Sequence, residues 1–313
     1  MQERICVIGG SNIDICGASL EPLRNFDSNP GVIDVSFGGV GRNIAQILAL
    51  LGEKPLFVSV FSADSYGRMM KADCDALGMD TSFSIVSEDY PSSMYIAILD
   101  SNHDMRVAMS DMRNLREMKP EHLKPVLSGL TKNDMIVIDA NLELECIRYV
   151  AENAPCALAA DPVSASKCLR LQDVLPSLAI FKPNVFEAQQ LNGIEIIDEE
   201  SACRSLDWFL ERGVKEIIIS MAEQGVLLGT EKEKKWFTHR LIDLDNATGG
   251  GDSFLGAYLT RRLHGIDPRQ AVRSAISAAV MTIEQDAVNR RRLCLADIEE
   301  AEASMEIREV NLC

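Results

Sequence analysis

The chain has 313 residues, of which 47% are hydrophobic, enough to bury one large core or two modest ones. It carries 31 basic and 47 acidic side chains, for a net charge of −16. So acidic a chain repels phosphate backbones and anionic lipids, which argues against binding to nucleic acid or membrane. It leaves room for a small phosphate ligand in a local pocket.

The chain shows no sign of export or of a membrane anchor. An acidic residue comes early, no apolar stretch of signal-peptide length follows it, and no uncharged run is long enough to cross a bilayer. The nine cysteines are scattered without a Cys-x-x-Cys pair, which favours free thiols in a reducing compartment over a disulfide or metal framework. We therefore expect a soluble, cytoplasmic protein.

Short apolar runs alternate with helical patterns along most of the chain. The expected strands are ICVIGG (5–10), PLFVSVF (55–61), MIVIDA (135–140), CALAAD (156–161), LAIFKPN (178–184) and EIIISM (216–221). The expected helices between them are 41–52, 66–78, 142–154 and 201–213. This alternation predicts an α/β fold, with a central, mostly parallel sheet and helices on both faces.

Two segments, at about 15–37 and 92–112, break this rhythm and read as β structure. We expect them to pair into a small β-sheet lid within a single domain that spans residues 1–313. The flat edges of such a sheet would be vulnerable alone, so we expect a homodimer through the lid.

Late in the chain, Gly249, Gly250 and Gly251 stand directly before Asp252 and an apolar helical run. Glycines at a helix start allow several N–H groups to converge on one anion, and the helix dipole adds positive potential there. A carboxylate in such a place would repel phosphate unless it accepts the proton of an attacking hydroxyl. The alternative is that Asp252 caps the helix and the glycines only form a turn.

Three earlier stretches carry similar polar signals. In GGSNIDICG (9–17), Asp14 follows the first strand, where open α/β sheets bind ligands. In FGGVGRNIAQILALLG (37–52), Asn43 lies near a helix start, and in FKPNVFEAQQL (181–191), Asn184 and Glu187 have capping-box spacing. Each stretch also has a plain structural interpretation as a loop, turn or cap. The functional interpretation of Asn184 and Glu187 is that they organise Mg²⁺ beside nucleotide phosphates.

Taken in this order, the four motifs resemble those of the PfkB/ribokinase family of sugar and nucleoside kinases. The elements are NxD after the first strand, GGxGxN before a helix, NxxE in mid-chain and TGxGD late in the chain. The missing GxGxxG after the first strand counts against a dinucleotide-binding oxidoreductase.

The resemblance implies a ribokinase-like fold, ATP and Mg²⁺ as cofactors, and a role for each matching residue. Asp252 would be the general base, with Gly249, Gly250 and Gly251 as the anion hole for the transferred phosphoryl group. The sugar would be bound by Asn12, Asp14, Gly39 and Asn43. The nucleotide would be bound by Asn184, Ser220, Gly225, Thr248, Gly249 and Gly251, and Mg²⁺ by Glu187. Asn246 and Ala247 depart from the family pattern near its monovalent-cation site, which leaves K⁺ dependence open.

Within the family, stretches such as SDMRN (110–114) and DPVSASKC (161–168) resemble the bacterial pseudouridine kinases more than the ribokinases. The resemblance implies phosphorylation of the 5′-hydroxyl of pseudouridine, with Ser28, Asn29, Asp111, Met112 and Lys167 as candidate contacts to the base. The alternatives are a kinase for another nucleoside or sugar, such as adenosine or ribose, and a non-catalytic nucleoside sensor.

Overall fold

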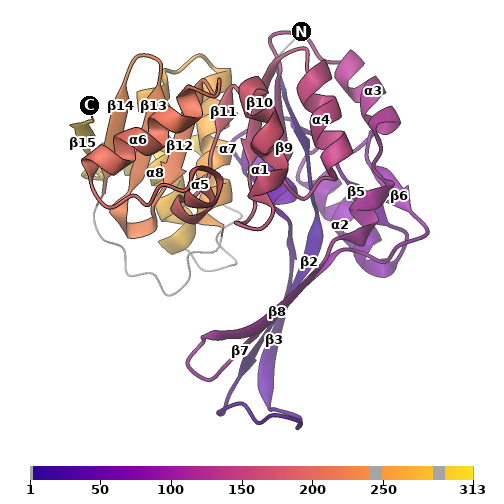
Figure 1. Ribbon diagram of the computed structural model, residues 1–313. Helices are drawn as coiled ribbons and strands as arrows, with labels where there is room; N and C mark the ends of the chain where they lie inside the picture. Colours follow the sequence, from indigo (N-terminus) through magenta and orange to yellow (C-terminus); the bar gives the residue numbers. More distant parts are fainter. Residues whose placement is uncertain (1–2, 240–248, 285–292, 313) are drawn as a thin grey trace.

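Buried apolar strands form the centre of the molecule, and a narrow sheet projects from it (Figure 1). The computed structural model describes residues 3–239, 249–284 and 293–312. Nine strands form the large sheet in the order β15-β14-β13-β12-β11-β10-β9-β1-β4. They are β1 (Ile5–Ile8), β4 (Leu56–Val58), β9 (Met135–Asp139), β10 (Ala157–Asp161), β11 (Ile180–Phe181), β12 (Glu216–Ser220), β13 (Val226–Thr230), β14 (Lys234–Thr238) and β15 (Arg308–Asn311).

Six neighbouring strands of this sheet run parallel, in the order β12-β11-β10-β9-β1-β4. Each of β13, β14 and β15 is antiparallel to the strand before it. The parallel strands are buried on both sides and read as continuous apolar runs, because helices cover both faces. The expected α/β fold with a mostly parallel central sheet is therefore confirmed. The antiparallel edge strand β15 was not foreseen.

The helices divide between the two faces of the large sheet, each with its own apolar core. One face is covered by α3 (Pro120–Ser128), α4 (Leu144–Asn153), α5 (Val185–Asn192) and α6 (Glu199–Leu210), and by the 3₁₀ helices η1 (Arg113–Glu117) and η2 (Cys168–Ser177). The other is covered by α1 (Val40–Leu50), α2 (Ser65–Ala76), α7 (Gly250–Leu263), α8 (Pro268–Glu284) and α9 (Leu295–Ser304). A short 3₁₀ turn, η3 (Ala222–Gln224), joins β12 to β13.

The projecting sheet has four strands in the order β3-β2-β7-β8. They are β2 (Asn12–Ser19), β3 (Gly31–Gly38), β7 (Met94–Leu99) and β8 (Met105–Asp111). A separate pair, β5 (Val60–Ser62) and β6 (Ile85–Ser87), lies beside α2. The small separate sheet that the sequence predicts is therefore present, and its strands come from the two segments that interrupt the helical pattern.

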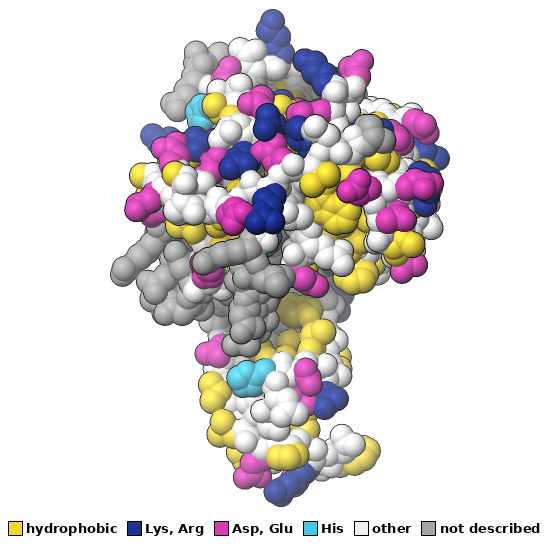
Figure 2. Space-filling model, turned by 90° about the vertical axis from the view of Figure 1, so that its left-hand side faces the viewer, with side chains coloured by type: hydrophobic (Ala, Val, Ile, Leu, Met, Phe, Trp, Pro, Cys, Tyr) yellow, Lys and Arg dark blue, Asp and Glu magenta, His cyan; other side chains and the backbone are white. Residues whose placement is uncertain are grey.

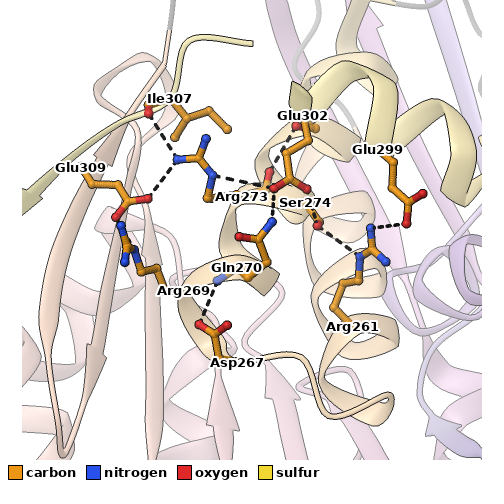
Figure 3. A network of polar contacts seen from close by, with 11 residues as sticks. Arg261, Asp267, Arg269, Gln270, Arg273, Ser274, Glu299, Glu302, Ile307 and Glu309 are labelled. Atoms are coloured by element: carbon orange, nitrogen blue, oxygen red, sulfur yellow. Dashed lines mark hydrogen bonds and ion pairs between the residues drawn. The ribbon is translucent and has the colours of Figure 1, made fainter. Parts of the chain in front are cut away.

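A polar network attaches the end of the chain to α7 and α8 (Figure 3). Arg273 on α8 donates to the carbonyl of Ile307 at 3.3 Å and to Glu309 at 2.9 Å. Ser274 donates to Glu302 on α9 at 2.7 Å and accepts from Arg261 on α7 at 3.1 Å. These contacts attach the first half of α8 to α7, α9 and β15.

Two features concern membrane-spanning helices and cysteine pairing. No helix in the described part of the chain is long and apolar enough to cross a membrane. Cys6, Cys16, Cys74, Cys146, Cys156, Cys168 and Cys294 are free thiols, in agreement with the sequence-based expectation. Cys203 departs from it, because it is disulfide-bonded.

Asp139, at the carboxyl end of β9, holds together two glycine loops that the sequence marks as candidate site segments. One of its carboxylate oxygens accepts from the backbone N–H groups of Gly10 and Gly41, both at 2.8 Å, and the other accepts from the backbone N–H of Asn141 at 2.9 Å. The side chain is 1% exposed, and burial raises its pKa while these hydrogen bonds oppose that rise. The carboxyl group thus joins the end of β1 to the start of α1.

We expect Asp139→Ala to lower the free energy of unfolding by about 3 kcal/mol or more, because it leaves three buried N–H groups without acceptors. Asp173→Ala is the control, since its ion pair with Arg148 is more than half exposed on both sides and is worth about 0–1 kcal/mol. Urea unfolding followed by circular dichroism measures both. Equal losses in the two variants would contradict this role for Asp139.

Candidate active site

Asp252 lies in the first turn of α7, at the junction of two cavities. Gly249 caps the helix with φ 84°, a left-handed conformation that favours glycine, and offers no side chain to the helix start. The first N–H groups of α7 therefore lack intrahelical partners beside Asp252. Such a helix start attracts negative charge.

The first cavity, of about 410 Å³, extends from Asp252 along the carboxyl ends of β10, β11 and β12. Its polar lining includes Asn184, Glu187, Ser220, Gly250 and Gly251, and Gly225 also borders it. Its apolar wall comes from the second half of α8, with Ile276, Ala279, Val280 and Ile283. The cavity thus combines a flat apolar wall with a polar end at the glycine loop.

The second cavity, of about 470 Å³, lies on the other side of Asp252, between the root of the small sheet and α1. Asp14, Asn43 and Gly249 line it together with Asp252. Asn43 donates from Nδ2 to Oδ2 of Asp252 at 2.8 Å. The structure therefore brings Asp14, Asn43 and Asp252 together, although they are far apart in the sequence.

The start of β2 and the cap of α1 shape the Asp14 side of this cavity. Asn12 donates to Oδ1 of Asp14 at 2.5 Å, and burial raises the pKa of Asp14. Gly39 has φ 98°, and a Cβ on it would lie 2.5 Å from the carbonyl oxygen of Gly10. A side chain at position 39 would thus be both strained and blocked by backbone. Glycine is required here because two loops of the backbone touch.

The carboxyl group of Asp252 has an altered pKa. Burial and the nearby Asp161 raise it to about 7, whereas the hydrogen bond from Asn43 and the charge of Lys182 work in the opposite direction. A group that changes protonation near neutral pH suits proton transfer.

Asn184 and Glu187 form the expected capping box at the start of α5. Oδ1 of Asn184 accepts from the N–H of Glu187 at 2.9 Å, and Oε2 of Glu187 accepts from the N–H of Asn184 at 2.8 Å. Glu187 is nevertheless 4% exposed at the cavity, and burial and Asp161 raise its pKa to about 7. The structural interpretation is thus present, and the residue still borders the cavity.

Two buried charged residues of this region were missed in the sequence as site candidates. Lys182 is 4% exposed, and its Nζ lies 3.3 Å from Oδ2 of Asp161 and 3.6 Å from the position of a Cβ on Gly251. Burial alone would lower the pKa of Lys182, but Asp161, Glu187 and Asp252 raise it. The second missed residue is Asp139. Both follow or end a predicted strand, and this position was the one feature of the sequence that could have identified them as site residues.

The candidate base contacts are spread over different places. Lys167 donates to Oδ1 of Asn141 at 2.6 Å, and Met112 packs beside Gly10, so both lie near the end of β1. Asp111 is paired with Arg113. Ser28 and Asn29 belong to the connection between β2 and β3, at the end of the small sheet that is remote from the large sheet (Figure 1).

Several expectations cannot be placed in this geometry. The five candidate base contacts line neither cavity, and these are Ser28, Asn29, Asp111, Met112 and Lys167. Asn29 is occupied by hydrogen bonds with Arg24 and Asp27. Thr248, Asn246 and Ala247 lie outside the described residues.

Comparison with known proteins agrees with this arrangement. A family model described as pfkB family carbohydrate kinase matches residues 2–291. The chain is 31% identical over 299 residues to the pseudouridine kinase of Escherichia coli K12, covering 95% of this chain and 96% of that protein. It is 26% identical to the guanosine-inosine kinase of Exiguobacterium acetylicum, covering 90% of this chain and 94% of that one.

The fold is also that of a solved kinase. The crystal structure of ribokinase from Thermotoga maritima superposes with a TM-score of 0.81 at 22% identity, and covers 97% of this chain and 100% of that one. The chain therefore belongs to the pfkB family of carbohydrate kinases and is a phosphotransferase that acts on a hydroxyl acceptor.

Proposed function

We propose that the protein transfers the γ-phosphoryl group of ATP to the 5′-hydroxyl of pseudouridine and so forms pseudouridine 5′-phosphate. The observation that carries this proposal is that Asp252 lines both cavities, beside the glycine-rich start of α7. A donor in one cavity and an acceptor in the other would meet at the one carboxylate suited to take the hydroxyl proton. Their alignment, rather than a covalent intermediate, would supply most of the rate.

The first cavity is the proposed ATP site. The apolar wall from α8 suits the flat face of an adenine, and the polar lining with Asn184, Ser220, Gly225 and the glycine loop suits the phosphates. Thr248 is proposed at the phosphates from the family pattern alone. The backbone N–H groups at Gly250 and Gly251, with buried Lys182, would balance the charge that develops on the transferred group.

The metal proposal depends on Glu187. No cluster of three or more His, Cys, Asp or Glu side chains in the described residues is arranged to hold a metal ion. Glu187 alone suits a Mg²⁺ ion that arrives with the nucleotide phosphates and keeps several water ligands, because such an ion needs only one or two protein carboxylates. Bound Mg²⁺ would neutralise phosphate charge. A monovalent cation near Asn246 stays an open possibility of the family pattern.

The second cavity is the proposed site of the ribose. Asp14 can accept hydrogen bonds from two neighbouring hydroxyls, with Asn12 holding its carboxylate and Asn43 beside the reacting end. Gly39 supplies backbone rather than a side chain. In this role Asp252 removes the proton from the hydroxyl as the phosphoryl group arrives.

The choice of pseudouridine is supported by the 31% identity to the Escherichia coli enzyme of that name. Lys167 and Met112, near the end of β1, are the proposed base contacts best placed for this role, together with Asp111. Ser28 and Asn29 would reach the base only if the small sheet moved toward the large one, as a lid does.

We also propose that two copies pair through the small sheet, in the cytoplasm. By strand register, Ile33, Val35, Ile96, Val107 and Met109 share the face opposite to Asp14. All five are exposed, and hydrophobic side chains are visible along this projecting sheet (Figure 2). A second copy that covers this apolar face would leave the Asp14 face free for substrate.

We expect pseudouridine to have the highest kcat/KM of a panel that includes uridine, adenosine, guanosine, ribose and fructose. Pseudouridine carries an extra base N–H that a polar site can read, so uridine should be a much poorer acceptor. Coupled measurement of ADP release tests this, with loss of the γ-phosphate to water as the background. A higher kcat/KM for any other acceptor would assign the enzyme a different substrate.

We expect Asp252→Asn to lower kcat by about 10²–10⁴, the usual contribution of a positioned base. Its KM for ATP should stay near that of the wild type, because the first cavity is otherwise unchanged. Asp297→Asn, on exposed α9, is the matched control. Turnover by Asp252→Asn close to the wild-type rate would remove Asp252 from the chemistry.

We expect kcat/KM to fall about tenfold per pH unit below pH 7. The pKa of Asp252 is raised to about 7, and the group acts as a base only when it is deprotonated, so activity is lost as pH falls through that value. A pH–rate profile from pH 5 to 9 measures this. An acid limb near pH 4, the ordinary range of an aspartate, would contradict the assignment.

A further inference from the structure

We propose that Arg42 is a positioning residue that orients Asn43, and through it Asp252, for phosphoryl transfer. The proposal rests on the role of Asp252 as the base in the proposed function. It concerns a chain of contacts from α2 through α1 to α7, in which Arg42, Asn43 and Asp252 all line the second cavity.

The chain begins at an ion pair between α2 and α1. NH2 of Arg42 donates to Oδ2 of Asp73 at 2.7 Å. The side chain of Arg42 is 2% exposed and that of Asp73 is 15% exposed, so the pair is shielded from solvent. A shielded ion pair is screened little by salt, and it fixes the direction of the guanidinium group.

The next contact fixes the Asn43 amide. NH1 of Arg42 lies 3.3 Å from Oδ1 of Asn43, and Nδ2 of Asn43 donates to Oδ2 of Asp252 at 2.8 Å. A guanidinium group can only donate, so the Asn43 atom that faces it must be the carbonyl oxygen. The NH₂ group of Asn43 is then directed at Asp252. When Asp252 is ionised, its carboxylate also requires the NH₂ group. When Asp252 is protonated, Arg42 is the group among these contacts that still fixes the orientation of the amide.

Arg42 also reaches the root of the small sheet. NH1 donates to the carbonyl of Phe37, at the end of β3, at 3.1 Å, and the guanidinium group lies over the Phe37 ring at 5.6 Å. The same side chain thus contacts the segment that carries the proposed lid and the residue that holds the proposed base. Arg42 thus contacts both the residue that aligns Asp252 and the root of the small sheet.

The buried charge of Arg42 lowers the stability of the fold, so packing alone does not explain an arginine at this position. Nε of Arg42 is buried and has no hydrogen-bond partner among the described residues. A buried charge with an unsatisfied donor destabilises a fold relative to a well-packed apolar side chain. A role in orienting Asn43 accounts for an arginine at this position.

The other groups around Asp252 do not supply this orientation. Asp161 and Lys182, from β10 and the end of β11, and Asp139, from β9, act on it through their charges. Glu187 and His239 line the same cavity. Among the described residues, Asn43 alone is recorded as a hydrogen-bond donor to the Asp252 side chain.

The test compares Arg42→Met, Arg42→Lys and Asp73→Asn with the wild type, using whichever acceptor the wild type phosphorylates fastest. Arg262→Met is the matched control, because it removes a comparable half-buried ion pair with Glu216 at the far end of α7. Kinetics are measured at a temperature where every variant is folded by circular dichroism. We expect Arg42→Met to lower kcat by about 10- to 100-fold with little change in the KM for ATP, as misalignment of a reacting group does.

Three further readouts separate orientation from general loss of stability. The acid limb of the pH–rate profile should move to higher pH in Arg42→Met, because the hydrogen bond from Asn43 favours the ionised base. Arg42→Lys should recover part of the kcat, since it keeps the charge but not the fork that reaches Asp73, Asn43 and Phe37 together. In a crystal structure of Arg42→Met, the Asn43 amide should no longer donate to Asp252.

The proposal is overturned if Arg42→Met, like Arg262→Met, lowers only the melting temperature, with kcat within twofold of wild type and an unmoved acid limb. It is also overturned if the Asn43–Asp252 contact persists unchanged in the Arg42→Met crystal structure. Failure of the proposed function has a different signature, because Asp252→Asn would then keep its activity. The crystallographic result decides the Arg42 proposal even if no acceptor of the panel is phosphorylated.

Discussion

The hydrogen bond from Asn43 to Asp252 joins the starts of two helices, and the rest of the site is arranged around it. α1 begins with Gly39 against the end of β1, and α7 begins with Gly249 in a left-handed conformation. Each start brings polar groups to the same point, from opposite ends of the chain. The large sheet makes this possible, because the carboxyl ends of its parallel strands open toward both loops.

A surplus of negative charge distinguishes the phosphate end of this site. Asp161, Glu187 and Asp252 share one buried cation, Lys182, so burial and mutual repulsion raise the pKa of two of the three acids to about 7. A bound metal ion that comes with nucleotide phosphates would relieve this repulsion. The arrangement therefore suits a cation beside these acids as well as an anion at the helix start.

The fold was predictable because its signals are local. Buried parallel strands read as short apolar runs, as in β9 and β12, and a glycine marks the start of α1 and of α7. Asp14, Asn43 and Asp252 were predictable as an ordered set of motifs, and the structure brings them together at one cavity. The position of β15 was not predictable, since it pairs with β14 from a distant part of the chain.

Residues whose role depends on burial could not be identified from the sequence either. Lys182 and Asp139 carry no motif spacing, and their charge matters only because the fold removes them from water. Arg42 lies inside a motif but points away from the glycines toward α2. Ser28 and Asn29 are the opposite case: the resemblance implies that they contact the base, but a resemblance in the sequence does not show that their loop reaches the site.

The most direct measurement is a crystal structure with pseudouridine and a non-hydrolysable ATP analogue. The account predicts that a carboxylate oxygen of Asp252 lies within hydrogen-bond distance, about 3 Å, of the 5′-hydroxyl, and that this hydroxyl faces the γ-phosphorus at the start of α7. A nucleoside whose 5′-hydroxyl is turned away from Asp252, or a triphosphate bound away from Gly250 and Gly251, would contradict it.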